Sequence, residues 1–204
     1  MSRKDVWNER YAGTELIWSA GPNILFAQAV KDLPPGTALD VACGEGRNAI
    51  WLAEQGWTVT GIDFSDTGID KARCIARARG VTVNWQVGDV AAETLAVGAY
   101  DLVAVLYLHT DPPERARWLP NAVNAVRRGG TFIYIGHDPS NIEHGIGGPQ
   151  RLELLPDIDE IRTALSGFRI ECAQVMKRTV SSDPGHGGSA ADEALDAYVR
   201  AVKD

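Results

Sequence analysis

The sequence contains few cysteines, no long apolar run and no excess of basic residues. Its three cysteines, at positions 43, 74 and 172, are widely spaced and match neither a disulfide framework nor a set of zinc ligands, which indicates a reducing, cytoplasmic environment. The longest strongly apolar run, residues 102–108, is too short to cross a bilayer, and the first six residues lack the apolar core of a secretory signal. A membrane is therefore not an expected partner.

Charge and composition narrow the class of protein further. Twenty basic against twenty-seven acidic residues give a formal net charge of −7, and no long basic cluster offsets it, so nucleic acid is not an expected partner. With 204 residues, of which 45% are hydrophobic and 23% charged, the chain is typical of a single globular domain. We expect one domain over 1–204, present as a monomer or homodimer.

Short β-like runs alternate with helical stretches, which predicts an α/β fold with a doubly wound, mostly parallel sheet and helices on both faces. The expected strands are 37–42, 57–62, 81–87, 100–108, 131–135 and 168–180. The expected helices are one or two within 6–31, then 48–55, 66–79, 112–128 and 157–165. Gly129-Gly130 is expected to stop the helix that ends at Arg127-Arg128, and 136–150 to form a loop. Residues 195–202 are ambiguous, and their spacing alone favours a helix.

The loop after the first expected strand carries the most specific pattern. Gly44 and Gly46 let the backbone approach a ligand closely, and Gly44-x-Gly46-x-x-Ala49 formally matches a dinucleotide fingerprint. A pyrophosphate on this turn would be repelled by Asp40 and Glu45, whereas a ligand with a sulfonium and an ammonium group would be attracted. The charges therefore favour S-adenosylmethionine over NAD. The alternative is a plain glycine turn with a solvated Glu45 and a capping Asp40.

Two further aspartates follow the next two expected strands. Asp63 ends the second strand, where a carboxylate can accept both hydroxyl protons of a ribose. Asp89 follows the third strand, where it can accept from an adenine amino group while the amide of Val90 donates to the ring. Each alone is more often a turn or cap residue. Because the carboxyl ends of parallel strands meet at one edge of the sheet, their recurrence indicates a nucleoside site there.

With these motifs the chain resembles the class I S-adenosylmethionine-dependent methyltransferases. The resemblance covers about residues 36–136, and Cys43-Gly44-x-Gly46-Arg47-Asn48 with Trp7-x-x-Arg10-Tyr11 points to the small-molecule branch of tellurite-resistance and thiopurine methyltransferases. It implies a seven-stranded Rossmann-like sheet with an antiparallel C-terminal hairpin, so that 195–202 is a strand. It also implies a helical cap over 1–35, a cofactor-binding core over 36–136 and a substrate-side section over 137–204.

The resemblance also implies which residues contact the cofactor. One departure is Ala42, which stands where the family has its first glycine and is expected to narrow the cofactor slot. The implied contacts are Tyr11, Trp18, Asp40, Ala42, Gly44, Gly46, Arg47, Asp63, Phe64, Ser65, Asp89, Val90 and Leu106.

Polar residues after the fourth and fifth expected strands are candidates for the substrate side. His109 is the candidate catalytic residue, as a substrate contact or a base, or else it only caps the adjacent turn. The other substrate-side candidates are His137, Asp138, Asn141, Glu143 and His144. Their spacing matches no compact zinc pattern, so no metal is expected. The alternative is a mobile polar loop that closes over substrate.

The leading hypothesis is therefore a methyltransferase that acts on the sulfur, oxygen or nitrogen atom of a small molecule, or on a chalcogen oxyanion. A nicotinamide-dependent oxidoreductase is the second hypothesis, although the chain lacks the length for a separate substrate domain. A third is a module that binds S-adenosylmethionine for regulation without catalysis.

Overall fold

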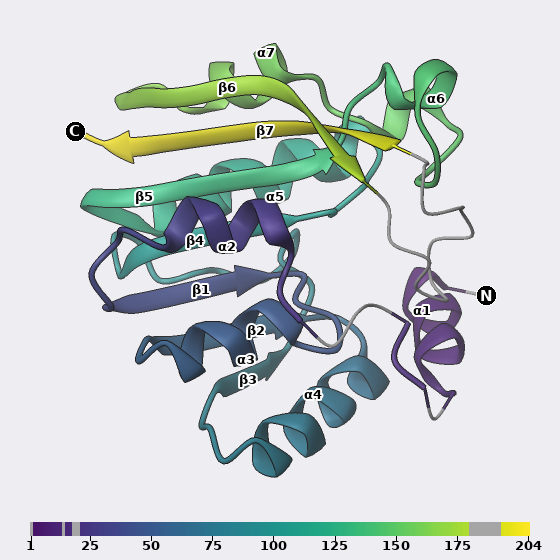
Figure 1. The fold of residues 1–204 in the computed structure, drawn as a ribbon, viewed down its shortest axis with the longest axis vertical. Coiled ribbons are helices and arrows are strands. Elements are labelled where there is room, and N and C mark those ends of the chain that lie inside the picture. Colours follow the sequence, from purple (N-terminus) through teal and green to yellow (C-terminus); the bar gives the residue numbers. More distant parts are fainter. Residues whose placement is uncertain (1, 14, 18–20, 180–192) are drawn as a thin grey trace.

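The computed structural model describes residues 2–13, 15–17, 21–179 and 193–204. Within these residues, seven strands form one sheet in the order β3-β2-β1-β4-β5-β7-β6 (Figure 1). The strands are β1 Thr37–Val41, β2 Thr58–Asp63, β3 Asn84–Val87, β4 Tyr100–Leu106, β5 Val126–His137, β6 Phe168–Thr179 and β7 Glu193–Lys203. Strands β1 to β5 pair in parallel, and β7 lies antiparallel between β5 and β6. The predicted doubly wound sheet with an antiparallel C-terminal hairpin is confirmed.

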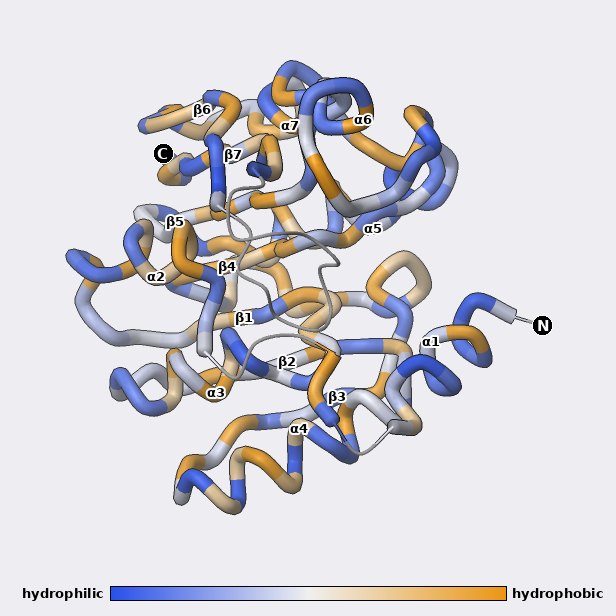
Figure 2. Tube along the Cα trace, turned by 45° about the vertical axis from the view of Figure 1, so that its right-hand side comes forward, coloured by the Kyte–Doolittle hydropathy of each residue, from blue (hydrophilic) through white to orange (hydrophobic). Residues whose placement is uncertain are grey.

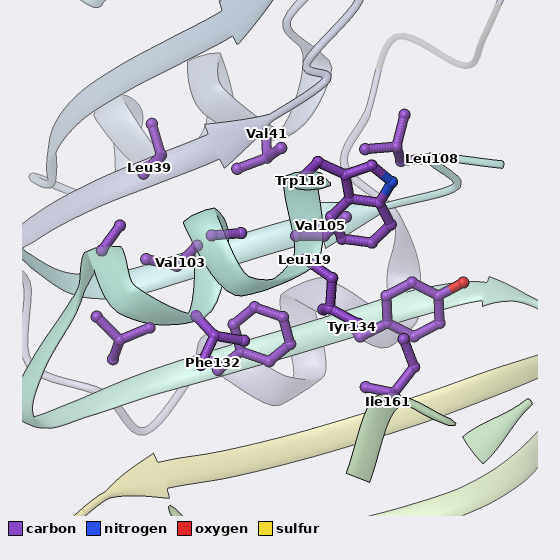
Figure 3. Close-up of a cluster of buried hydrophobic side chains, with 14 of the residues drawn as sticks. Leu39, Val41, Val103, Val105, Leu108, Trp118, Leu119, Phe132, Tyr134 and Ile161 are labelled. Atoms are coloured by element: carbon purple, nitrogen blue, oxygen red, sulfur yellow. The ribbon is translucent and has the colours of Figure 1, made fainter. Parts of the chain in front are cut away.

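Helices cover both faces of the sheet. They are α1 Arg3–Tyr11, α2 Ile24–Val30, α3 Arg47–Glu54, α4 Asp66–Ala78, α5 Pro112–Ala125, α6 Asn141–His144 and α7 Ile158–Ala164, with a short 3-10 turn at Leu152–Leu154. Helices α5 and α7 pack on one face, where Trp118 and Phe132 are fully buried in the cluster of Figure 3. Helices α2 and α3 pack on the other face around Phe26 and Leu52. Burial on both faces explains the nearly continuous apolar run of β4.

Helices α4 and α5 begin at the residues that the sequence predicts, whereas α1 begins at Arg3, before the expected range of 6–31. The side chain of Asp111 accepts a hydrogen bond from the amide of Glu114 at 2.9 Å, and prolines fill the first two positions of α5. Ser65 caps α4 in the same way through the amide of Gly68. Figure 2 shows hydrophobic and hydrophilic residues alternating along α4, whose buried residues all lie on one face.

The end of α5 differs from the prediction. The helix ends at Ala125, and β5 begins at Val126, so Arg127-Arg128 and Gly129-Gly130 belong to the strand rather than to a helix terminus. The backbone of Val126 is already extended, and the register between β4 and β5 shifts before Thr131, which accommodates the extra residues. Arg127 forms an ion pair with Asp101 of β4, which holds this segment on the sheet.

In the C-terminal half, the strand that the resemblance implies over 195–202 is confirmed as part of β7. The helical spacing of this segment is misleading, because β7 is enclosed between two other strands and carries buried residues on both faces. One difference remains in this half. The expected loop over 136–150 is shorter than predicted, because β5 continues to His137 and α6 occupies Asn141–His144. Two strands are shorter than expected. Strand β3 covers only Asn84–Val87 instead of 81–87, and β4 ends at Leu106 instead of continuing to residue 108. Among the described residues, no helix is long and apolar enough to span a membrane.

Candidate active site at the carboxyl edge of the sheet

The loop between β1 and α3 has a tightly constrained backbone. Ala42, Gly44 and Gly46 all have positive φ angles, of 56°, 54° and 77°. A Cβ atom at Gly46 would lie 2.4 Å from the indole of Trp85, and one at Gly44 would lie 2.6 Å from the hydroxyl oxygen of Tyr11. Glycine is therefore required at both positions by conformation and by space. Ala42 adopts the left-handed conformation although its methyl group makes this conformation less favourable than it is for glycine.

Asp40 lies beneath this loop and stabilises the start of α3. Its carboxylate is 1% exposed and accepts a hydrogen bond from the amide of Ala49 at 3.1 Å. Burial raises the pKa of the Asp40 carboxyl to about 7, although the bond from Ala49 and the charge of Arg47 oppose the shift. Asp40 thus takes the capping role that was the alternative interpretation of this residue.

The raised pKa of Asp40 predicts a pH dependence of folding stability. An unfolded carboxyl titrates near 3.8, so between about pH 4 and pH 7 the folded protein holds a proton that the unfolded chain has released. The contribution of Asp40 to stability is therefore complete below about pH 4 and is lost as the pH rises through about 7, at a rate of at most about 1.4 kcal/mol per pH unit. Asp40→Asn keeps the acceptor for Ala49 and is expected to reduce this slope.

Urea unfolding at about pH 5 and about pH 7 measures the slope in the wild type and in Asp40→Asn. Burial also raises the pKa of Asp63, so part of the slope is expected to persist in the variant. If the free energy of unfolding changes equally with pH in the two proteins, the pH dependence does not come from Asp40.

Glu45 is not the solvated charge that its place in the loop suggests. It is 3% exposed, lies 2.9 Å from the ammonium nitrogen of Lys71, and accepts a hydrogen bond from the amide of Ile17 at 3.0 Å. Its charge is therefore balanced within the protein. The expected repulsion of a pyrophosphate by Asp40 and Glu45 is weaker than the sequence suggests, because Lys71 pairs with one carboxylate and burial disfavours ionisation of the other.

Asp63 occupies the position that the sequence predicts, at the end of β2. One carboxylate oxygen accepts a hydrogen bond from the amide of Gly44 and the other from the amide of Ser65, both at 2.8 Å. The side chain faces a small cavity at the carboxyl ends of the strands. The cavity is lined by Arg3, Ala42, Ile62, Asp63, Phe64, Gly88, Asp89, Val90, Leu108 and Glu114. Five predicted cofactor contacts, at positions 42, 63, 64, 89 and 90, therefore meet around one cavity.

The segment after β3 is fixed from two sides. The carboxylate of Asp89 accepts a hydrogen bond from the amide of Ala91 at 2.9 Å. The side-chain amide of Asn121 in α5 donates to the carbonyl groups of Val90 and Glu93, at 2.9 and 2.7 Å. These bonds hold Asp89 and Val90 at the rim of the cavity without using the side chain of Val90, which is buried.

Helix α1 contributes Arg3 to the lining of this cavity. The guanidinium of Arg3 forms an ion pair with Glu114 and lies 5.2 Å from the centroid of the Phe64 ring. The hydroxyl of Ser65 donates to the side-chain oxygen of Asn8 at 2.6 Å. Tyr11, a predicted cofactor contact, is buried at the end of α1 and lies over Gly44. Trp18 lies outside the described residues.

Two other predicted cofactor residues lie apart from the cavity lining. Arg47 opens α3, and burial lowers the pKa of its guanidinium, whose charged neighbours include Tyr107, Arg178 and Asp40. Leu106 ends β4 and packs in the cluster beneath α2 and α3. Arg47 thus has both Tyr107 and the predicted cofactor contact Tyr11 among its neighbours, whereas Leu106 contributes to the core.

The structure brings His109 and His137 together. Their imidazole rings stack with centroids 5.4 Å apart and an angle of 18°, and Nε2 of His109 accepts a hydrogen bond from the main-chain amide of His137 at 3.2 Å. Burial, and to a lesser extent His137 and Arg115, lower the pKa of His109 to about 3. His109 is therefore neutral near pH 7, and the lone pair that a base needs is already engaged.

The four remaining substrate-side candidates do not converge. Asp138 accepts hydrogen bonds from the amide and hydroxyl of Ser140, and Asn141 accepts from the amide of Leu195 at 2.7 Å, so both residues fix the segment around α6. Glu143 and His144 are exposed, with 80% and 68% of their side chains accessible. Among the described residues, no group of three potential ligands could hold a metal ion.

Sequence reasoning missed three residues that surround the two histidines. Tyr107 follows β4 with a φ angle of 55°, and its hydroxyl donates to Asp196 of β7 at 2.7 Å. Nε of Arg178 in β6 donates to the same carboxylate oxygen at 2.7 Å. The one available signal was Asp196 itself, a charged residue with apolar neighbours on both sides in the strand.

The sequence matches known methyltransferases over its central part. Residues 38–130 match the family described as "Methyltransferase domain". The 2-heptyl-1-hydroxyquinolin-4(1H)-one methyltransferase of Mycobacteroides abscessus is 32% identical over 129 residues, which cover 62% of this chain and 56% of that protein. The chain thus matches only a little over half the length of this curated relative.

Two solved structures resemble the whole chain. One comes from a study of the conversion of a disulfide bond into a thioacetal group during echinomycin biosynthesis, with a TM-score of 0.76 and 22% identity, over 100% of this chain and 94% of the other. The other is magnesium protoporphyrin IX methyltransferase from Synechocystis PCC 6803 with bound S-adenosylmethionine, with a TM-score of 0.66 and 18% identity, over 100% and 98% of the chains. These likenesses show a common fold. Residues 38–130 are thus similar to a methyltransferase-domain family, and the chain shares its overall fold with both solved structures.

Proposed function

We propose that this protein transfers a methyl group from S-adenosylmethionine to a small molecule. The observation that carries the proposal is the placement of Asp63 in the cavity at the carboxyl edge of the sheet, with Asp89 and Val90 beside it. Each carboxylate oxygen of Asp63 accepts one backbone amide and has a further lone pair, so both oxygens are able to accept a ribose hydroxyl. Asp89 and the amide of Val90 then face the adenine edge.

The hydrogen bonds of the glycine loop count against a phosphate ligand. A pyrophosphate binds to backbone amides at the start of a helix. Here the amide of Gly44 donates to Asp63, that of Gly46 to the carbonyl of Cys43 at 2.9 Å, and that of Ala49 to Asp40. These three donors are already used by the protein, which favours a sulfonium nucleoside over NAD more directly than the charge of Glu45 does.

Several narrower expectations belong to this proposal. A small-molecule acceptor is supported by the name of the curated relative, which is a methyltransferase of a hydroxyquinolone. The net charge of −7 favours such an acceptor over nucleic acid. The three free cysteines support a cytoplasmic location. Membership of the tellurite-resistance and thiopurine branch stays a prediction from the sequence.

Ligand binding and turnover together test the proposal. Calorimetry is expected to show binding of S-adenosylhomocysteine, and no binding of NADH under the same conditions. Incubation with S-adenosylmethionine and a panel of thiols, phenols, amines and chalcogen oxyanions is expected to release S-adenosylhomocysteine with at least one acceptor. Binding without turnover across the panel indicates a regulatory module instead. Binding of NADH but not of S-adenosylhomocysteine contradicts the proposal.

A further inference from the structure

One nearly buried arginine uses a single nitrogen of its guanidinium within the described part of the fold. Arg178 of β6 has 11% of its side chain exposed, and its Nε atom donates a hydrogen bond to Oδ2 of Asp196 at 2.7 Å. Its guanidinium carbon lies 5.5 Å from the centroid of the Tyr107 ring. Its two terminal nitrogens make no hydrogen bond with any residue that the structure describes. These nitrogens therefore remain able to donate to another group.

Arg115 of α5 shows how the protein satisfies a buried guanidinium elsewhere. Its side chain is 5% exposed, and its Nε atom donates to Oε1 of Glu160 at 2.6 Å. Its Nη1 atom donates to the carbonyl oxygens of Thr110 and Glu153, at 2.6 and 3.3 Å. Because buried polar groups in proteins normally have such partners, the unused terminal nitrogens of Arg178 indicate a binding site rather than a structural contact.

The orientation of the Arg178 guanidinium is fixed before any ligand binds. Asp196 is 0% exposed, and its Oδ2 atom also accepts a hydrogen bond from the hydroxyl of Tyr107 at 2.7 Å. The side-chain amide of Asn23, at the start of α2, donates to the same hydroxyl at 3.1 Å. Burial lowers the pKa of Arg178, but Tyr107 and Asp196 raise it above its ordinary value, so the guanidinium stays charged. The terminal nitrogens therefore form a charged and preorganised fork.

The order of the strands places this fork on the same edge of the sheet as the proposed nucleoside cavity. From that cavity, at the ends of β2 and β3, the strands follow as β1, β4, β5, β7 and β6 (Figure 1). Tyr107 follows β4, and Asp196 pairs with His137 at the end of β5. The glycine loop and Tyr107 thus follow adjacent strands, which lie about 4.8 Å apart. A small molecule bound at the glycine loop can therefore extend toward Arg178.

Arg47 links Arg178 to the glycine loop. It is the first residue of α3, and its titratable neighbours include Tyr107, Arg178 and Tyr11. Tyr11 lies over Gly44 of the loop. Burial and the charge of Arg178 lower the pKa of the Arg47 guanidinium, so the two cations repel each other at partly buried positions. An anionic group near both would relieve this repulsion, whereas a cation would increase it.

We propose that the terminal nitrogens of Arg178 bind a carboxylate of a molecule held at the carboxyl edge of the sheet. The planar guanidinium fork matches the two oxygens of a carboxylate, and paired hydrogen bonds between charged groups are stronger than neutral ones. Such a carboxylate can belong to the methyl acceptor or to the amino-acid part of the cofactor. The acceptor is the expected source, because Arg178 lies at the β6 side of the sheet and the nucleoside cavity at the β3 side. That assignment rests on the proposed methyl transfer, whereas the carboxylate site itself does not.

Acetate and acetamide test the site in the full chain without a cofactor. Binding is followed by NMR at constant ionic strength, from the Nε–H signal of Arg178 and the amide signals of β6 and β7. Acetate is expected to shift these signals and to bind at least about tenfold more tightly than acetamide, which has a similar shape but no charge. Arg178→Lys keeps a cation beside Asp196 but lacks the fork, and is expected to lose this preference for acetate.

The matched control for this variant is Arg169→Lys. Arg169 lies in the same strand, is exposed and pairs with Glu171, so the control is expected to bind acetate as the wild type does. Equal binding of acetate and acetamide by the wild type, or an unchanged preference in Arg178→Lys, overturns the carboxylate site. The comparison of the two ligands in the wild type decides even if Arg178→Lys does not fold.

The same titrations with S-adenosylhomocysteine present identify the source of the carboxylate. If the acceptor supplies it, acetate still shifts the Arg178 signal in protein saturated with S-adenosylhomocysteine, and Arg178→Lys binds S-adenosylhomocysteine within about threefold of the wild type. If the cofactor supplies it, S-adenosylhomocysteine prevents the shift, and Arg178→Lys binds it at least about tenfold more weakly but binds 5′-methylthioadenosine, which lacks the carboxylate, equally well. This second result overturns the assignment to the acceptor. Failure of the wild type to bind S-adenosylhomocysteine contradicts the proposed function instead, and the acetate titration still decides the carboxylate site.

Discussion

Replacement of Asp63 by alanine is expected to weaken the binding of S-adenosylhomocysteine by at least about 100-fold. Two hydrogen bonds from ribose hydroxyls to a carboxylate contribute about 1.5 kcal/mol or more each, and about 1.4 kcal/mol corresponds to a factor of ten in the dissociation constant. The substitution also leaves the amides of Gly44 and Ser65 without their acceptor, because the two oxygens of Asp63 hold both. Isothermal titration calorimetry measures the change directly.

Two further variants separate the lost ligand contact from damage to the loop. Asp63→Asn keeps one acceptor oxygen for a backbone amide and is expected to retain more affinity than Asp63→Ala. Asp70→Asn removes a carboxylate from the exposed surface of α4 and is expected to bind as the wild type does. Affinity in Asp63→Ala within about threefold of the wild type would show that the nucleoside does not lie against this residue.

Trp118→Ala is expected to cause the largest loss of folding stability, about 3 to 5 kcal/mol. The indole is 0% exposed and lies beside Val105, Leu108 and Leu119 between α5 and the sheet (Figure 3). Its truncation removes buried apolar area and leaves a cavity that close-packed neighbours fill only in part. Because small domains are stable by only about 5 to 15 kcal/mol, this is a substantial fraction of the total.

The polar atom of the same side chain anchors the segment after β4. Nε1 of Trp118 donates a hydrogen bond to the hydroxyl of Thr110 at 2.8 Å, next to His109. Trp118→Phe keeps most of the ring but loses this donor, and is expected to cost about 1 to 2 kcal/mol. Urea unfolding followed by circular dichroism measures both variants. A loss below about 1 kcal/mol in Trp118→Ala contradicts the packing described for this cluster.

Most of the fold is predictable because local signals agree with tertiary packing. Strand β4 is apolar along nearly its whole length, and the acidic cap with two prolines defines the start of α5. The misplaced end of α5 lacks such agreement, because residues 126–130 join a helix directly to a strand. The spacing of Leu195, Tyr198 and Val202 imitates a helix although β5 and β6 enclose that segment, so only the family resemblance predicted the strand.

The candidate site also contains residues that were predictable from the sequence and residues that were not. The placement of Asp63 and Asp89 at one cavity was predictable because Asp63 ends β2 and Asp89 follows β3, and the topology alone brings strand ends to one edge. The ion pair between Glu45 and Lys71 was not predictable, because the two residues are separated by 26 positions in the sequence. Tyr107 and Asp196 are separated by 89 positions, and only the order of β4, β5 and β7 in the sheet brings them into contact.

The internal hydrogen bonds of the glycine loop have a consequence for the kinetics of ligand capture. Since Asp40 and Asp63 hold the loop amides in their final shape before any ligand arrives, this part of the site is preorganised, and association entails little loss of conformational entropy there. Helix α1 differs, because only side-chain contacts such as those of Arg3 with Glu114 and of Asn8 with Ser65 are described between it and the cavity region. We therefore expect detachment of α1, rather than rearrangement of the loop, to govern the residence time of a bound nucleoside.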